Sequence, residues 1–467
     1  MTSMKKELLS FVLAGVAISG TAGNAAKQHP NVILIVADDL GWGDVGYHGS
    51  EIRTPNIDSF VKSGIELDRF YTAPISSPSR AGLMTGRYPN RFGFRESVLP
   101  PWRKGGLPLN EETFADVLDA CGYKNRAMIG KWHLGHSSKA YHPLRRGFSH
   151  FHGLLNGAFD YFTHKREGEL DWHDDWNPCY EEGYSTDLIG DEAVRCIEEY
   201  SKTSPYFLYV AFNAPHTPYE APKEDIAEYI PLDQFNKLEK KEQDGWTYRA
   251  MVTRMDLNIG KILSALDKSG DAENTIVLFM SDNGGVPGLE PYSECRPLRG
   301  HKFDEWEGGV RVPAAIRWPD GFMKGGKVID QIVSFVDILP TVADIIDAPT
   351  PRNPYDGISV YSLLAGKEKK LDRVLYLGLG AAVSHNYKLI IANKDKGLRL
   401  EEDYFTDILK DPGEKSDGKL KGRERHKERL RRVIIQYDSI KPAMPEQPYG
   451  KGEKGFKAPK EWNIGDL

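Results

Sequence analysis

Four short runs of mainly apolar residues most constrain what this chain can fold into. Each has the length of one strand buried on both faces, as in a parallel sheet, and helical patterns separate them. Strands that alternate with helices predict an α/β fold around a mainly parallel sheet. The predicted strands are residues 32–37, 126–129, 206–212 and 275–280, and the helical patterns are residues 56–62, 111–120, 186–200 and 248–269.

Acidic residues and an amide follow the first and the last of these runs. Asp38 and Asp39 follow the first run, and Asp282 and Asn283 come just after the fourth. Because the carboxyl ends of parallel strands meet at one edge of a sheet, we expect the four side chains to lie close together. Carboxylate and amide oxygens are ligands of hard divalent cations, so this set favours calcium or magnesium over zinc.

Basic residues follow the other two runs. Lys131 and His133 come after the second run, and His216 comes after the third. A lysine and two histidines are therefore expected at the same edge of the sheet as the carboxylates. Each position alone is ordinary in a loop, whereas their coincidence indicates a catalytic site.

The segment of residues 76–87, SSPSRAGLMTGR, carries a second signal. Pro78 suits the first turn of a helix, and Ser77 suits the N-cap before it. A helix that begins there points backbone N–H groups at an anion, and Arg80 adds a planar, permanently charged group. These features indicate a site for a tetrahedral oxyanion, although a capped helix alone would explain the same spacing.

The same segment resembles the signature of the type I sulfatases, the formylglycine-dependent family. In that family the first signature position, here Ser76, is Cys or Ser and is oxidised after synthesis to Cα-formylglycine. The resemblance implies an alkaline-phosphatase-like α/β fold and the hydrolysis of sulfate esters. Further segments that resemble family motifs are residues 31–46 (NVILIVADDLGWGDVG), 130–135 (GKWHLG), 297–313 (PLRGHKFDEWEGGVRVP) and 411–414 (DPGE).

The resemblance also implies a role for each site residue. Arg80 would favour the anionic form of the nucleophile, and Lys131, Lys302 and His216 would surround the sulfate. His216 or Lys302 would protonate the departing sugar oxygen, and His133 would take a proton as sulfate leaves. One calcium ion, or magnesium in its place, would be held by Asp38, Asp39, Asp282 and Asn283.

A serine at the modified position resembles the Ser-type bacterial sulfatases, whose maturation partner is a radical enzyme that works without oxygen. Two other functions stay open on the sequence. One is a phosphatase or phosphodiesterase of the alkaline phosphatase superfamily that uses Ser76 directly. The other is a sulfated-glycan receptor that binds without conversion of Ser76.

The N-terminus has the pattern of a secretory signal. Lys5 and Lys6 precede an apolar stretch at residues 8–18, and small residues follow to Ala26. This order predicts a signal peptide over residues 1–26 and an exported, periplasmic protein without a membrane anchor. The net charge of −6, from 61 basic and 67 acidic residues, becomes −7 on its removal. Without a basic excess, nucleic-acid binding is not expected.

Four cysteines in 467 residues, none in a CxxC pair, exclude a disulfide framework and indicate no zinc site. They are interpreted as buried thiols or one incidental disulfide. Turn-rich, charged sequence near residues 356–368 predicts a domain boundary. We therefore expect a catalytic domain over residues 27–366 and a smaller α+β domain over residues 367–467, ending in an extended tail that wraps the surface.

Aromatic and acidic residues in two stretches, 156–164 and 168–184, suit a sugar site, because aromatic faces stack on sugar rings and carboxylates accept hydroxyl protons. A packed surface loop is the alternative. Residues 145–148 (RRGF), Asp160-Tyr161 and residues 182–186 (EGYST) resemble the branch that contains N-acetylgalactosamine-4-sulfatases, which favours galactose or N-acetylgalactosamine sulfates. The mature charge of −7 offers no broad basic groove for a long polyanion, which favours an enzyme that acts on the ends of short saccharides. The candidate sugar contacts are Asp160, Tyr161, Trp172, His173 and His301.

Overall fold

The computed structural model describes residues 29–95, 97–203, 205–393, 397–444 and 452–464. The predicted signal peptide lies outside these residues. Within them, no helix combines the length and the apolar character needed to cross a membrane. All four cysteines are described and are free thiols, so the incidental disulfide is not formed.

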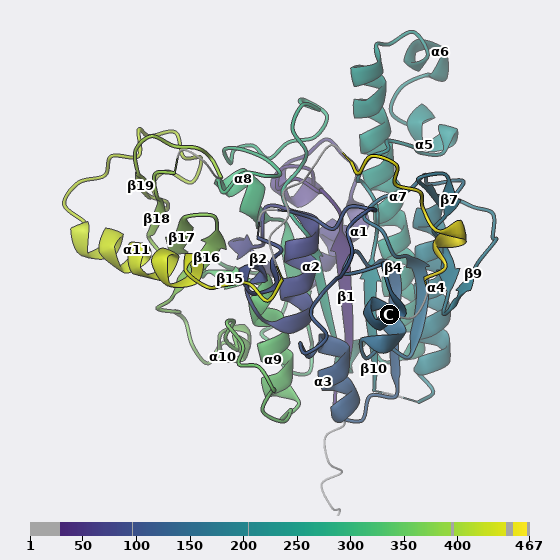
Figure 1. Cartoon of the computed structure of the whole chain (residues 1–467), viewed down its shortest axis with the longest axis horizontal. Coiled ribbons are helices and arrows are strands. Elements are labelled where there is room, and N and C mark those ends of the chain that lie inside the picture. The colour runs from purple at the N-terminus through teal and green to yellow at the C-terminus, as the bar shows by residue number, and fades with distance from the viewer. Residues whose placement is uncertain (1–28, 96, 204, 394–396, 445–451, 465–467) are drawn as a thin grey trace, which may run out of the picture.

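A ten-stranded sheet runs through the centre of the molecule (Figure 1). Its five middle strands, β11, β1, β10, β4 and β5, pair in parallel, which confirms the α/β prediction. The four predicted strands are four of these five. In spatial order the strands are β14 (Lys327–Ile329), β2 (Ile65–Leu67), β13 (Ala314–Arg317), β11 (Thr275–Ser281), β1 (Asn31–Ala37), β10 (Tyr206–Ala211), β4 (Asn125–Lys131), β5 (His150–Leu154), β8 (His173–Asp174) and β9 (Asn177–Pro178).

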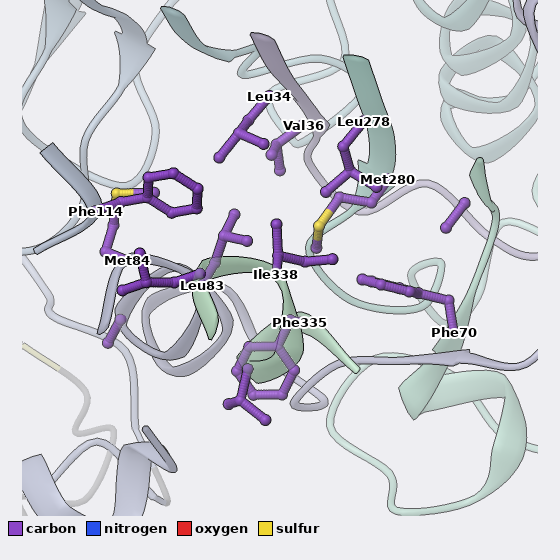
Figure 2. Close-up of a cluster of buried hydrophobic side chains, with 14 of the residues drawn as sticks. Leu34, Val36, Phe70, Leu83, Met84, Phe114, Leu278, Met280, Phe335 and Ile338 are labelled. Atoms are coloured by element: carbon purple, nitrogen blue, oxygen red, sulfur yellow. The ribbon is translucent and has the colours of Figure 1, made fainter. Parts of the chain in front are cut away.

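Helices cover both faces of the sheet, and β1 shows why. Leu34 and Val36 point into one core cluster, whereas Ile33 and Ile35 point into the other, because side chains alternate along a strand. Figure 2 shows the first cluster, where helix residues such as Leu83 and Ile338 pack beneath the sheet. The helices on that face are α2 (Ser76–Thr85), α3 (Phe114–Ala120) and α9 (Ile338–Ile345); those on the other are α1 (Pro55–Ser63), α4 (Ser185–Tyr200) and α7 (Lys240–Ser269).

The predicted helices are all present, and α7 differs most from its predicted bounds. It begins at Lys240 instead of Tyr248, so its first two turns lie outside the predicted pattern. Those turns are polar and show no apolar face, but Glu239 and Glu242 form a capping box that starts the helix there. Four further helices are short: α5 (Lys223–Ala227), α6 (Leu232–Phe235), α8 (Glu307–Val310) and α10 (Tyr361–Leu364).

The C-terminal part contains an antiparallel four-stranded sheet backed by helix α11 (Glu424–Asp438). Leu375, Val383 and Ile390 of this sheet belong to the same core cluster as β1, so the apolar core is continuous between the two parts. The boundary at residue 366 stays a prediction. The strands are β16 (Val374–Gly378), β17 (Ala381–Ser384), β18 (Tyr387–Ile390) and β19 (Tyr404–Asp407).

Two smaller sheets border the site described next. In the first, short strands pair the segment after residue 302 with the segment that leads into α2, and the second is a hairpin near the C-terminal tail. Their strands are β12 (Arg311–Val312), β3 (Phe70–Tyr71) and β15 (Val333–Ser334), and β6 (Lys165–Arg166) with β7 (Glu169–Leu170).

Candidate active site

The acidic residues that follow β1 and β11 meet at the carboxyl edge of the sheet. The Asn283 Nδ2 donates to Asp39 Oδ1 at 2.7 Å, and the backbone N–H of Asp39 donates to Asp282 Oδ1 at 3.2 Å. Asp38 lies beside them and is buried like the other three. The parallel pairing of β1 and β11 aligns the two strand ends, which places these four oxygen-bearing side chains together.

Helix α2 brings Ser76 to this cluster. Its hydroxyl lies 3.1 Å from Asp38 Oδ1 and 3.2 Å from Asn283 Oδ1. The helix begins at Ser76 itself, with Ile75 as the N-cap residue, so the prediction of Ser77 as N-cap is wrong. The Ser77 hydroxyl instead donates to the carbonyl of His133 and accepts the N–H of Leu99, which joins three segments of the site.

Three basic side chains neutralise the three carboxylates. Arg80, one turn along α2, donates its Nε to Asp282 Oδ2 at 3.0 Å. Lys131, at the end of β4, pairs with Asp38. Lys302 donates to Asp39 Oδ2 at 2.8 Å. Each carboxylate therefore has its own cation, and all of these groups are buried.

Burial and charge act against each other on these pKa values. Burial opposes ionisation of Asp39, but Lys302 and His216 outweigh it and hold its pKa below the ordinary value. Burial, reinforced by Asp38, raises the pKa of Asp282. Burial would lower the pKa of Lys302, yet Asp39 raises it overall, so Lys302 stays protonated.

The donor set fits a hard divalent cation. Ligand atoms of Asp38, Asp39 and His216 lie within 4.8 Å of one another, and the oxygens of Asp282 and Asn283 adjoin them through the contacts above. Several buried carboxylates in one place are costly unless cations share them. Oxygen donors of this kind are those that calcium and magnesium take.

Two histidines complete the site. The Nε2 of His133 lies 3.2 Å from the carbonyl oxygen of Leu99, and its Nδ1 has no hydrogen-bond partner among the described residues. Burial, together with Lys131 and Arg80, holds the His133 pKa well below its usual range. His216 Nε2 lies 3.6 Å from Asp39 Oδ2, and its Nδ1 lies 2.6 Å from the carbonyl oxygen of Thr217.

These groups face a cavity of about 280 Å³, called here the active-site cavity. Four of the site residues lie on its wall together with apolar loop residues, and the other charged site residues lie behind them. The lining includes Ser76, His133, His216 and Lys302, with Leu99, Pro101, Gly157, Arg166, Pro218 and Phe303. The sequence motifs that seemed separate therefore open onto one space.

Three of the five predicted sugar contacts are buried in the structure. Trp172 and His173 are buried, 0% and 3% exposed, and neither lines the active-site cavity. The Tyr161 hydroxyl donates to the carbonyls of Asn213 and His216 at 2.6 and 2.7 Å, so Tyr161 supports the His216 loop. These three residues are thereby corrected from sugar contacts to packing residues.

The other two candidates are more accessible but do not line the cavity either. Asp160 accepts the backbone N–H groups of Phe162 and Thr163 and so shapes its own turn. His301 lies next to Lys302, with its Nδ1 3.3 Å from Asp304. Their side chains have local partners, and their role as sugar contacts stays a prediction.

Sequence reasoning missed two contributors. Arg166 lines the active-site cavity from the β6–β7 hairpin, and nothing in its sequence context indicated which space it faces. Asp44 holds the loop after β1: it accepts from the Tyr248 hydroxyl at 2.6 Å and from the Glu294 N–H at 2.6 Å. Burial raises the Asp44 pKa to about 6, and those donors limit the rise. Its place inside the segment of residues 31–46 was the only signal.

Comparison with known proteins gives a consistent result. The family model described as Sulfatase matches residues 30–348. Arylsulfatase J of Mus musculus is 34% identical over 354 residues, which are 74% of this chain and 57% of that protein. N-acetylgalactosamine-6-sulfatase of Homo sapiens is 33% identical over 382 residues, which are 76% of this chain and 70% of that protein.

A solved structure extends the likeness to the fold. The crystal structure of Ps i-CgsB in complex with k-i-k-neocarrahexaose has a TM-score of 0.78 and 32% sequence identity, and the match covers 90% of this chain and 95% of that one. The chain spans little more than half the length of arylsulfatase J but nearly all of this structural relative. The family match, these relatives and the site geometry agree: the chain belongs to the sulfatase family.

Proposed function

We propose that this protein hydrolyses O-sulfate esters of carbohydrates and releases inorganic sulfate. The observation that carries the proposal is the position of Ser76. It begins a buried helix, lies within hydrogen-bond distance of Asp38 and Asn283, and faces a cavity that His133 and Lys302 also line. A nucleophile precursor and proton-transfer groups thus share one cavity, and the cation-binding oxygens lie directly behind the Ser76 hydroxyl.

Sulfatases in general use formylglycine and a metal ion, and we propose both here. Ser76 is the residue to be converted, by a Ser-type maturation enzyme that works without oxygen. The modified group supplies a hydrated aldehyde with two hydroxyl groups, where an unmodified serine has only one. Without conversion, Ser76 could be sulfated once but has no second hydroxyl through which to release the sulfate.

Calcium is the proposed metal, held by Asp38, Asp39, Asp282 and Asn283. When bound, it supplies positive charge next to the nucleophile and the sulfate. Arg80 holds Asp282 in place, because its guanidinium donates to that carboxylate at 3.0 Å and to the Lys131 carbonyl at 3.0 Å. Arg80 is fully buried, so its charge acts on the site with little solvent screening.

Lys131 and Lys302 lie on two sides of the carboxylates, paired with Asp38 and Asp39 respectively. We propose that both ammonium groups stabilise the negative charge that develops on the sulfate oxygens in the transition state. This arrangement also argues against a phosphatase with two metal ions, because a second cation needs further ligands, whereas two lysines repel it.

His133 is proposed to accept the proton that leaves as sulfate is released. Its Nε2–H is directed at the Leu99 carbonyl, so Nδ1 carries the free lone pair in the neutral ring. The lowered pKa keeps the ring neutral at pH 7 and therefore able to accept a proton. The atom proposed to take the proton is thus Nδ1.

The proton for the departing sugar oxygen comes from His216 or Lys302, both on the cavity wall. The Nδ1–H of His216 is directed at the Thr217 carbonyl, so Nε2 donates only when the ring is protonated. A pH profile separates the two. With His216 as donor, kcat falls as pH rises through the His216 pKa; with Lys302 as donor, kcat holds to higher pH.

The proposed substrates carry sulfated galactose or N-acetylgalactosamine. Relatives in two groups support this: one is named for N-acetylgalactosamine 6-sulfate, and one binds a neocarrahexaose. The resemblance in the sequence was to 4-sulfatases, so we leave the 4- and 6-positions to experiment. The active-site cavity, of about 280 Å³, lies just below the range of about 300–1,000 Å³ typical of small-molecule sites, which suits one sugar unit rather than several.

The test is sulfate release from a panel of sulfated mono- and oligosaccharides. The protein is co-expressed with a Ser-type maturation enzyme, and conversion is verified by the loss of two hydrogens in the mass of the Ser76 peptide. We expect release from a galactose or N-acetylgalactosamine sulfate and none from Ser76→Ala. Release from glucosamine sulfates alone would overturn the substrate class. Phosphate release without conversion would support the phosphatase, and binding without any release the receptor.

A further inference from the structure

A second cavity, of about 380 Å³, lies beside the active-site cavity. We call it the tail cavity, because the C-terminal tail forms one of its walls. Residues 101–105 and 136–141 form the others. Pro101 lines both cavities, so the two are neighbours across a single residue. The volume falls within the range of about 300–1,000 Å³ typical of small-molecule sites.

The tail that forms this wall is fixed to the active site by specific contacts. Trp462 is 1% exposed, and its Nε1 donates to the carbonyl of Arg166 at 3.0 Å. The backbone N–H of Glu461 donates to Glu169 Oε2 at 2.9 Å. Figure 1 shows this part of the tail, in yellow, next to β7. Since Arg166 lines the active-site cavity, one hairpin supports a wall of each space.

The tail cavity has the lining of a saccharide site. Trp102 and Phe456 are partly exposed, and their ring centroids lie 6.4 Å apart at 71°. Tyr141 also lines the tail cavity, and so does Lys104, which is exposed. Aromatic faces suit the apolar faces of sugar rings, and a lysine suits sulfate or carboxylate groups on them. Of the charged lining residues, Arg103 and Lys104 are basic and Glu453 alone is acidic.

His136 forms a buried part of the wall of the tail cavity. It is 2% exposed, lines the tail cavity, and has its Nε2 2.9 Å from the Pro101 carbonyl. Burial lowers the His136 pKa, so the ring is neutral with its proton on Nε2. Its Nδ1 is then an acceptor, and it has no hydrogen-bond partner among the residues the structure describes.

We propose that the tail cavity binds the sugar unit next to the sulfated one, so that this enzyme prefers oligosaccharides to monosaccharides. The inference rests on the proposed sulfatase function and adds the size of the substrate to it. The two cavities adjoin at Pro101, so neighbouring units of one saccharide would occupy them, and this adjacency favours a saccharide over a protein partner. Trp102, Lys104 and Phe456 are the proposed contacts.

The test compares two substrates on the converted enzyme: N-acetylgalactosamine 6-sulfate and a chondroitin 6-sulfate tetrasaccharide, with the 4-sulfate pair in parallel. The variants are Trp102→Ala, Phe456→Ala and Lys104→Gln. Trp246→Ala is the matched control, because Trp246 is also partly exposed but lines neither cavity. We expect Trp102→Ala and Phe456→Ala to lower kcat/KM for the tetrasaccharide by about three- to tenfold, and to leave the monosaccharide unchanged.

A binding measurement gives a second readout. Calorimetry of the tetrasaccharide with Ser76→Ala should show a Kd that Trp102→Ala raises by a similar factor and Trp246→Ala does not. Equal losses on both substrates, or none on the tetrasaccharide, would overturn the tail cavity as a sugar site while leaving the sulfatase intact. If sulfate is released from neither substrate, the proposed function is wrong, and this inference is wrong with it.

Discussion

The protein contains two buried clusters of charged side chains that have different roles. Lys302 of one and Glu307 of the other lie five positions apart in the sequence. The site cluster pairs Asp38, Asp39 and Asp282 with Arg80, Lys131 and Lys302, and it reaches the active-site cavity through Lys302. The loop cluster lies where the segment after Lys302 meets the C-terminal sheet. It joins Glu307 of α8, Lys388 of β18 and Glu414, and all three side chains are fully buried.

The loop cluster is closed on itself. Lys388 Nζ lies 3.0 Å from both Glu307 Oε1 and Glu414 Oε1, and the Glu307 N–H donates to Glu414 Oε2 at 2.6 Å. The Tyr71 hydroxyl donates to Glu307 Oε2 at 2.9 Å. None of these three charged residues lines the active-site cavity. The same chemistry of buried ion pairs thus fixes a segment in one place and leaves charge available to a ligand in the other.

The comparison separates activity from stability. Changes in the site cluster should affect catalysis more than folding, and changes in the loop cluster should do the reverse.

The largest effect is expected for Ser76→Ala. This change removes the modified residue, and we expect kcat/KM to fall by at least about 10⁴-fold. Among the described residues the Ser76 hydroxyl has two hydrogen-bond partners, Asp38 and Asn283, so the midpoint of thermal unfolding should move little. Ion chromatography of released sulfate and a thermal melt measure the two quantities. A variant that retains a tenth of the activity would exclude Ser76 as the nucleophile precursor.

Lys131→Met should come next, with a fall of about 10²–10³-fold in kcat/KM, because it removes one cation that faces the developing charge. The loss leaves Asp38 without its lysine, which a bound calcium ion would offset. We therefore expect added calcium to raise the thermal midpoint of Lys131→Met more than that of wild type, and EDTA to abolish activity in wild type. Full activity in EDTA would contradict a metal site at these carboxylates.

The strands and the site cluster could be predicted because their signals are local. Apolar runs such as residues 32–37 read as buried strands without knowledge of their neighbours, and the parallel order then brings Asp38 and Asp282 to one edge. The signature around Ser76 is likewise contiguous in the sequence. Only the start of α2 differed, because Ser77 is used to join the His133 and Leu99 segments rather than to cap the helix.

The sugar contacts and the loop cluster could not be predicted, because both depend on which way side chains point across long separations. Trp172 looked suited to a sugar but packs on Phe159 and His164 in the core. Lys388 and Glu307 are 81 positions apart, and nothing in either segment indicates the other. The tail was expected to wrap the surface, and most of residues 452–461 are exposed, but the sequence did not indicate that Trp462 is buried against the β6–β7 hairpin.

Lys388→Met tests the loop cluster. It leaves Glu307 and Glu414 buried without their shared cation, and breaking a buried pair in this way costs about 3–5 kcal/mol of unfolding free energy. The loss should be the same with and without calcium, in contrast to Lys131→Met. Urea unfolding at fixed calcium concentrations measures it. Lys388 does not line the active-site cavity, so the remaining activity per folded molecule should stay within about threefold of wild type. A threefold change corresponds to under about 1 kcal/mol in the activation free energy. Dependence of the loss on calcium would show that the two clusters are coupled.

The smallest effect concerns Glu305, which lies between the two clusters along the chain. It is fully buried, and neither carboxyl oxygen has a hydrogen-bond partner among the described residues. Burial, with Asp304 adding to it, raises its pKa from 4.5 to about 8. A raised pKa in the folded state means that the neutral carboxyl is tolerated and the ionised form is not. Its contribution to stability is therefore complete below pH 4.5 and is lost as pH rises towards 8.

We expect Glu305→Gln, which cannot ionise, to remove this part of the pH dependence. Between pH 5 and pH 8, wild type should lose about 3 kcal/mol of unfolding free energy more than the variant, as a pKa difference of this size implies. Urea unfolding of both proteins at the two pH values gives the difference directly, and titration of every other group, Glu414 included, cancels between them. Equal slopes in wild type and variant would mean that Glu305 is ionised in the folded protein at neutral pH, and that the segment after Lys302 holds a buried charge outside both clusters.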